Sequence, residues 1–161
     1  MRRLALAVMA ISFSLGCLAE LKIKSPPQIC TLLNDTQLRT GEWAVHADGQ
    51  EGCVGAARPA SSGTSDPNRI SYSANGTQGV PSRVQLLLSV NVPSDEEAAK
   101  RELVKAAKRL SIRTLGLSTP PSIVESIMKG RPAKLEVGSG SITVSRQTNN
   151  KQNYVLTVSI E

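Results

Sequence analysis

The chain has 161 residues and a formal net charge of +6, with 19 Lys and Arg against 13 Asp and Glu. This length suits one domain that buries roughly two-thirds of the surface its unfolded chain exposes. Aromatic residues make up only 2% of the chain, too few for the stacking platforms that bind single-stranded nucleic acids. Because the charge excess is also mild, nucleic acid is not an expected partner.

The first 19 residues have the three-part pattern of an export signal. Met1-Arg2-Arg3 is basic, and an uncharged, mostly apolar run follows from Leu4 to Leu15. This run is too short to cross a bilayer comfortably, and it ends in the small-residue stretch before Glu20. We therefore expect residues 1–19 to direct export and residues 20–161 to form the mature domain.

Two processing sites are open at the end of this signal. Ser14-Leu15-Gly16-Cys17 resembles a bacterial lipobox, with Ser14 in place of the usual aliphatic residue. This resemblance implies a lipid on Cys17 that anchors the chain in a bacterial membrane, the only membrane attachment it implies. Leu18 after the cysteine is compatible with sorting to the outer membrane. Cys17-Leu18-Ala19 is instead similar to a cleavage site that ends at Ala19 and releases a periplasmic or secreted chain.

Cys30 and Cys53 remain in the mature chain under both readings. An even pair in an exported protein predicts a disulfide, here closing a loop of about 24 residues and worth about 3 kcal/mol. Two free buried thiols are the alternative. Two cysteines and the single His46 lack further ligands at a recognisable spacing, so we expect no metal, and no motif indicates a cofactor.

The first part of the mature domain predicts a helix followed by a short hairpin. Ser25-Pro26-Pro27-Gln28 is typical of a helix start, and Gly41 of a helix end. Alternation from Trp43 to Ala47 predicts a strand that ends at the turn signal Asp48-Gly49, with a returning strand over residues 53–56.

A loop and a second hairpin come next. Residues 58–68 are rich in turn formers and have no apolar period, which predicts a long, mobile surface loop. Ile70, Tyr72 and Ala74 alternate with serines, and Asn75-Gly76 predicts the turn toward the next strand.

A half-buried strand and a helix form the centre of the chain. Alternation from Val84 to Val92 gives the strand one apolar face, and Pro93 ends it. Ser94 and Glu97 match a capping box that opens a helix over residues 95–113. The positions expected to face the core are Ala99, Leu103, Ala106 and Leu110.

The C-terminal part predicts a short helix and then strands. The helix begins near Thr119 and ends at Gly130, and three alternating segments form a β-meander. Its last strand, Tyr154–Ile160, is the candidate for an exposed edge that invites pairing with a partner. The predicted fold class is α+β, a mainly antiparallel sheet with about three helices on one face, in a single small domain.

The helix over residues 95–113 carries a set of basic side chains. Charges matched to the helix dipole and solvated by water explain them most simply. The alternative is a face that associates with an anionic membrane surface. The residues concerned are Lys100, Arg101, Lys105, Lys108 and Arg109.

No catalytic motif is recognisable. His46 is the only histidine, and no nucleophile or orienting acid can be assigned to it from the sequence. We therefore expect a small exported, bacterial, non-catalytic envelope protein that binds another protein or an envelope polymer. An exported hydrolase that uses His46 with a serine nucleophile is the alternative from a different class.

Overall fold

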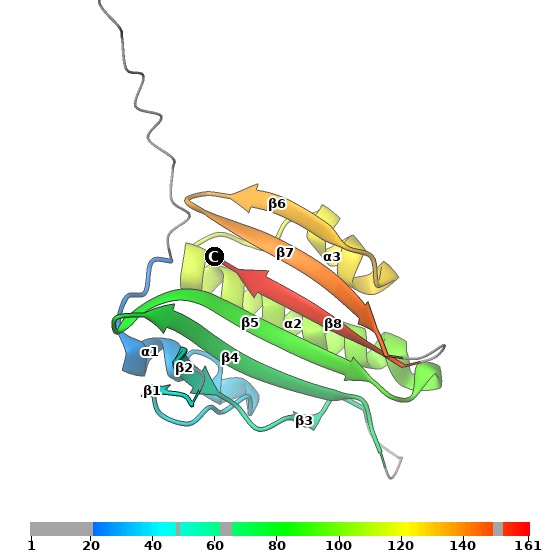
Figure 1. Ribbon diagram of the computed structural model, residues 1–161. Coiled ribbons are helices and arrows are strands. Elements are labelled where there is room, and N and C mark those ends of the chain that lie inside the picture. The colour runs from blue at the N-terminus through cyan, green and yellow to red at the C-terminus, as the bar shows by residue number, and fades with distance from the viewer. Residues whose placement is uncertain (1–20, 48, 62–65, 150–152) are drawn as a thin grey trace, which may run out of the picture.

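The computed structural model describes residues 21–47, 49–61, 66–149 and 153–161. The predicted export signal, with Cys17 and Ala19, lies outside the described residues. Within them the predicted α+β fold is confirmed: helices cover one face of a single antiparallel sheet of eight strands (Figure 1). On the other face of the sheet there is no helix among the residues that the structure describes.

The helices are few and differ in length. They are α1 (Pro26–Cys30), α2 (Glu96–Leu115) and α3 (Pro121–Lys129), with single 3₁₀ turns at Asn34–Thr36 and Pro93–Asp95. The strands are β1 (Ala44–Val45), β2 (Glu51–Val54), β3 (Arg58–Pro59), β4 (Arg69–Thr77), β5 (Val80–Val90), β6 (Ala133–Val137), β7 (Gly140–Thr148) and β8 (Tyr154–Ile160).

The strand order is β1-β2-β4-β5-β8-β7-β6, with β3 paired beside β4. The expectation that Tyr154–Ile160 is an edge strand is therefore wrong, because β8 pairs with both β5 and β7. The chain leaves β5 through α2 and α3, forms the β6–β7 hairpin, and returns to fill the central position. Alternation along β8 fixes which face is buried, but it carries no information about neighbours.

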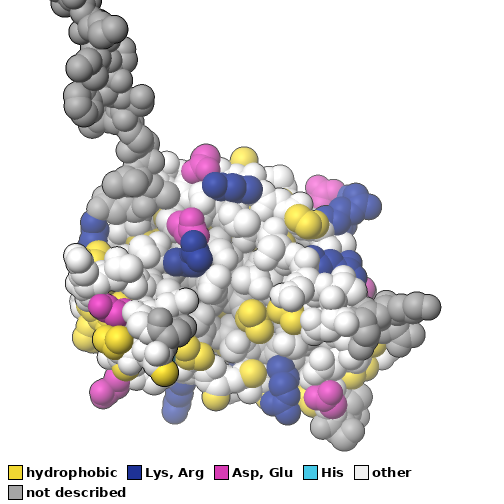
Figure 2. All heavy atoms as spheres, in the orientation of Figure 1, with side chains coloured by type: hydrophobic (Ala, Val, Ile, Leu, Met, Phe, Trp, Pro, Cys, Tyr) yellow, Lys and Arg dark blue, Asp and Glu magenta, His cyan; other side chains and the backbone are white. Residues whose placement is uncertain are grey.

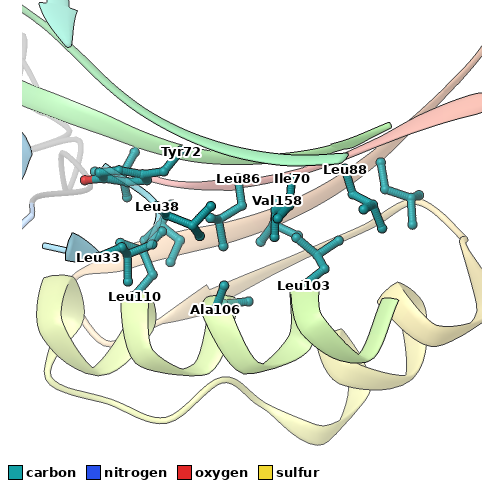
Figure 3. Close-up of a cluster of buried hydrophobic side chains, with 14 of the residues drawn as sticks. Leu33, Leu38, Ile70, Tyr72, Leu86, Leu88, Leu103, Ala106, Leu110 and Val158 are labelled. Atoms are coloured by element: carbon teal, nitrogen blue, oxygen red, sulfur yellow. The ribbon is translucent and has the colours of Figure 1, made fainter. Parts of the chain in front are cut away.

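The core lies between α2 and the inner face of the sheet. As predicted, alternate residues of β5 are fully buried: Val84, Leu86, Leu88 and Val90. The four helix positions expected to face them are buried as well. Figure 3 shows Leu103, Ala106 and Leu110 of α2 pointing toward Leu86, Leu88 and Val158 of the sheet. Each such large side chain stabilises the fold by roughly 1.5–3 kcal/mol.

The first helix ends earlier than predicted. The first helix stops at Cys30, where the Thr31 hydroxyl donates to the carbonyls of Pro27 or Gln28. After it the chain makes a 3₁₀ turn and reaches Gln37 with a φ of 62°. The Thr36 hydroxyl donates to the Leu33 carbonyl at 2.7 Å, a local bond to backbone that competes with a continued helix. The helix therefore cannot extend to Gly41.

The predicted capping box does not form. Ser94 lies inside the 3₁₀ turn, and α2 begins at Glu96 after Asp95, which makes no side-chain cap hydrogen bond. Glu97 pairs instead with Arg101 one turn further on. The Pro93 ring at the first position favours the tight turn and shifts the helix start past the serine.

The second hairpin turns later than expected. Asn75 and Gly76 lie within β4 at a bulge, and the turn is made by Gln78 and Gly79 at φ values of 52° and 72°. Two consecutive left-handed residues match the twist of a two-residue hairpin. Glu51 accepts the N–H of Gly79 at 2.5 Å, which holds the turn against the neighbouring strand.

The segment over residues 58–68 is attached to the sheet at both described ends. Arg58 and Pro59 pair with β4 as β3. The fully buried Asn68 accepts the N–H groups of Asn91 and Val92, each at 2.8 Å. Residues 62–65 lie outside the described residues, and the mobility expected for this segment stays a prediction.

The predicted disulfide is present between Cys30 and Cys53, with both residues buried. It joins the end of α1 to β2, as expected of a bond between the first helix and the sheet. Because it closes a loop within the chain, it restricts the unfolded state as well.

We expect the double variant Cys30→Ala/Cys53→Ala to lose about 3 kcal/mol of unfolding free energy, the loop-closure value for this separation. Urea denaturation of the oxidised protein and of the variant measures the difference. Addition of reductant should destabilise the wild type to the same extent and leave the variant unchanged. Equal stability of variant and wild type would contradict the assigned role of this bond.

Candidate functional site

A groove lies beside α1 at the N-terminal end of the described chain. It has a volume of about 750 Å³. Two short segments line it: α1 with the residue after it, and the stretch that precedes β1. The lining residues are Pro26, Pro27, Cys30, Thr31, Thr40, Gly41, Glu42 and Trp43. Apolar rings, two hydroxyls and one carboxylate therefore converge in one hollow, the composition typical of a binding site.

Covalent and hydrogen bonds hold the two sides of this groove together. The disulfide fixes Cys30 against β2, and the Thr40 hydroxyl donates to the Cys30 carbonyl at 2.8 Å. On the buried side of α1, the Tyr72 hydroxyl donates to the Ile29 carbonyl at 2.7 Å. Burial raises the pKa of Tyr72, which keeps the phenol protonated as a donor. The groove is thus largely preformed.

Trp43 is the single tryptophan of the chain. Its ring is partly buried against the core, and its indole N–H is buried without an acceptor among the described residues. An unpaired buried donor costs about 1–3 kcal/mol.

Sequence reasoning did not find this groove. Trp43 and the prolines at positions 26 and 27 are 16 or more positions apart, and no spacing rule relates them. The predicted disulfide was the available signal, because it brings the first helix to the strand after Trp43.

The open face of the sheet is a second surface with a uniform character. Side chains in register across β4, β5, β8 and β7 form rows on this face. One row is Ser73, Gln85, Ser159 and Thr143, and the next is Ser71, Leu87, Thr157 and Ser145. Gln85 donates to the Ser159 hydroxyl at 3.1 Å within its row.

Hydroxyl and amide groups therefore dominate this face. Figure 2 views it directly: most of its surface is neither charged nor hydrophobic, with a few hydrophobic side chains near the middle. Leu87 is 40% exposed at the centre. An antiparallel sheet tolerates water on such a face, so the hydrogen-bonding groups are free to meet a polar ligand.

His46 lies exposed in the hairpin between β1 and β2. Its backbone bonds with Gln50 and Gly49 close that hairpin. Within the described part of the chain, its side chain has no hydrogen bond to a serine or an acid. The structure therefore does not bring His46 together with the partners that the hydrolase alternative needs.

The basic residues of α2 are not gathered into one free surface. Lys100 is only 6% exposed and donates to Glu96 at 3.1 Å. Three other side chains are paired with acids: Arg101 with Glu97, Lys105 with Glu102, and Arg109 with Asp35. Lys108 is exposed. Nearby acids thus neutralise most of the charge on which membrane association would depend.

Asp35 also receives a two-armed contact from Arg113, with both nitrogens 2.8 Å from its carboxylate. The hydrogen bond from Arg113 lowers the pKa of Asp35. Arg113 donates to the Leu32 carbonyl as well. This contact ties the N-terminal segment to the end of α2.

A polar cluster surrounds Tyr154 where β8 meets the start of α2. The Tyr154 hydroxyl donates to Glu96 at 2.7 Å, and the Arg146 guanidinium lies 3.9 Å from the ring centroid. Burial by itself raises the pKa of Glu96, but the hydrogen bonds from Tyr154 and Lys100 prevail and hold it below its usual value. Burial and the bond to Glu96 raise the pKa of Tyr154. Lys100 therefore serves this cluster rather than the surface.

Two further observations limit the chemistry of the described residues. No group of three His, Cys, Asp or Glu side chains among them is placed to hold a metal ion. None of the helices in the same ranges combines the length and the apolar character that a membrane crossing needs.

We expect Glu96→Gln to lower stability at pH 7 by about 1 kcal/mol, since the partly exposed carboxylate compensates a buried Lys100. A carboxyl with a lowered folded-state pKa stabilises above its unfolded pKa, and this contribution disappears as pH falls through the folded pKa. The difference from wild type should therefore shrink below about pH 4. Denaturation at several pH values measures it.

The matched control for this prediction is Glu97→Gln, whose carboxylate pairs with Arg101 where both side chains are well exposed to solvent. It should change stability by less than about 0.5 kcal/mol at any pH. Equal behaviour of the two variants would contradict the role given to Glu96.

Comparisons of the chain with protein-family models, with characterised proteins and with solved structures find no match. The case for a function therefore depends on the groove beside Trp43 and on the open face of the sheet.

Proposed function

We propose that the protein is a small exported, non-catalytic protein of a bacterial cell envelope that binds another envelope protein through the groove beside Trp43. The observation that supports this most is the groove itself, a preformed hollow lined by one tryptophan and two prolines. Tryptophan is the residue most enriched at the energetic centres of protein interfaces.

The chemistry of the groove favours one kind of ligand. Proline and tryptophan rings offer flat apolar surface to an extended segment. An extended peptide supplies apolar side chains that can pack on these rings. The groove is therefore suited to a short segment of a partner protein.

Export is supported by the basic and apolar start of the sequence together with the Cys30–Cys53 bond. Disulfides persist in oxidising compartments outside the cytoplasm. The first processing site would give a chain anchored by a lipid at Cys17, and the second a periplasmic or secreted chain with a free end after Ala19.

An envelope polymer is the second candidate ligand, and the open face of the sheet favours it. The rows of serine, threonine and glutamine side chains offer many neutral hydrogen-bonding groups and no aromatic ring. Such a surface matches a hydroxyl-rich glycan better than it matches the apolar centre of a protein interface.

The other two functions gain less support. A hydrolase would need a serine and an acid near His46, whose exposed side chain has no hydrogen bond to either among the residues that the structure describes. Association with anionic lipid would need free cations on α2, where most are paired.

Export predicts a defined mature chain. Intact mass of the natively expressed protein should fit a lipidated chain beginning at Cys17 in the membrane fraction, or a soluble chain beginning at Glu20. Thiol labelling should find Cys30 and Cys53 unreactive until reductant is added. An uncleaved chain with reactive thiols would contradict export.

The groove predicts a site-specific contact with a partner. A photo-crosslinking amino acid at Thr31 or Glu42, both groove residues, should give a discrete protein adduct in cells of the source organism. The same group at the exposed Glu125 of α3 is the matched control and should give none.

Trp43→Ala should abolish that adduct, and Trp43→Phe, which keeps a smaller aromatic ring, should reduce it less. Since Trp43 is the only tryptophan, a shift in its fluorescence on adding the identified partner reports occupancy directly. Adducts equal at Thr31 and Glu125, or unaffected by Trp43→Ala, would contradict the groove. Co-sedimentation with purified cell-wall sacculi, independent of Trp43, would favour the polymer.

A further inference from the structure

The edge of the sheet at β6 is unpaired. β6 pairs with β7 on one side, and no strand of the described residues lies on its other side. The sequence there is Ala133-Lys134-Leu135-Glu136-Val137. An open strand edge presents backbone donors and acceptors that can pair with another strand. Natural proteins usually protect such edges from pairing. The backbone groups and side chains that this edge exposes therefore decide what can pair with it.

The backbone groups that face outward can be identified. Ser141 exchanges both of its backbone hydrogen bonds with Glu161, on the β8 side of β7. Its neighbours Gly140 and Ile142 must therefore turn toward β6, where they are opposite Val137 and Leu135. By the same alternation, the N–H and C=O groups of Lys134 and Glu136 point to the free edge.

We propose that β6 pairs antiparallel with β6 of a second copy of this chain, centred on Leu135. In this register Lys134 of each copy lies opposite Glu136 of the other, and Leu135 lies opposite Leu135. The outward backbone groups of residues 134 and 136 then form two hydrogen-bonded pairs. The contact is two-fold symmetric and self-complementary.

Charge selects this register. Lys134 and Glu136 share the outer face of the strand, so both gain an opposite charge across the new pair. A shift that puts Lys134 opposite Lys134, or Glu136 opposite Glu136, brings like charges together instead. Shifts that pair residue 134 with residue 135 put side chains on opposite faces of the sheet and are excluded.

The side chains at the edge are available for this contact. Within one copy, Lys134 Nζ lies 3.7 Å from Glu136 Oε1, and both side chains are well exposed, so this ion pair is weak. Leu135 is 39% exposed on the helix-covered face. In the dimer it would lie opposite Leu135 of the second copy. This is a non-hydrogen-bonded pair, in which the side chains are close, so both leucines would be shielded from water. Pro132, which has no N–H, ends the pairing one step before Lys134.

The test is sedimentation of the processed protein over a range of concentrations. The wild type should form a dimer, and Lys134→Glu or Glu136→Lys should each raise the dissociation constant by about tenfold or more, because each sets like charges opposite one another. The exchanged variant Lys134→Glu/Glu136→Lys should dimerise as the wild type does. An equimolar mixture of the two single variants should form a mixed dimer.

Two controls separate edge pairing from other effects. Glu125→Lys makes the same change in net charge as Glu136→Lys on an exposed position of α3, and should leave the dimer intact. Glu136→Pro removes an edge N–H without removing a bond to β7, and should abolish the dimer while circular dichroism stays native.

A wild type that is monomeric at all concentrations would overturn the proposal. So would single charge variants that dimerise normally, or an exchanged variant that does not recover.

Discussion

The packing of α2 on the inner face of β4, β5 and β8 is the constraint on which the rest of the structure depends. The helix is long enough to cross these strands, and its small residue Ala106 lets it approach the sheet between Leu103 and Leu110 (Figure 3). Most apolar residues of β4, β5 and β8 lie at the alternate positions that face the helix. The outer face consequently carries mainly serine, threonine and glutamine, with Leu87 as an exposed exception, and needs no cover. One-sided burial thus creates the open polar face directly.

The N-terminal segment has little regular structure and is held by particular contacts instead. The disulfide joins it to β2, the Tyr72 hydroxyl donates to the Ile29 carbonyl, and Asp35 forms an ion pair with Arg113 of α2. Because the segment is fixed at these separate points, the stretches around Pro26 and Trp43 face each other across a hollow rather than closing on it. The same contacts that compensate for a short helix therefore form the groove.

The sequence was informative where one local rule decides the outcome. Alternation at Val84–Val90 and the apolar stripe of α2 predicted buried faces correctly, and cysteine parity predicted the Cys30–Cys53 bond. Prediction was poorer where two local rules compete. Ser94 satisfies a capping box, but Pro93 favours a tight turn first. Asn75-Gly76 is a strong turn signal, yet Gln78-Gly79 makes the turn.

Long-range relations were beyond any such rule. That β8 is central depends on the path through α2 and α3. That Lys100 is buried depends on Tyr154, which approaches from β8 and bonds Glu96, the partner of Lys100 one turn earlier in α2. In the sequence, Lys100 looks like any other basic residue on an exposed helix face, so nothing there indicates its burial. The groove was missed for the same reason, since it exists only between segments that the disulfide brings together.

The two proposed contacts lie at opposite ends of the sheet. The groove is beside β1 and β2, whereas β6 is the last strand in the order. A dimer joined at β6 would place seven strands of each copy side by side, so at about 4.8 Å per strand the two grooves would be about 60 Å apart. Neither groove nor open face would be covered, and both open faces would continue as one surface. Such an arrangement strengthens binding to a repetitive or extended partner more than to a small isolated one, because a second contact is gained only where the partner spans the distance. An envelope, with its polymers and arrays of protein, offers partners of that kind.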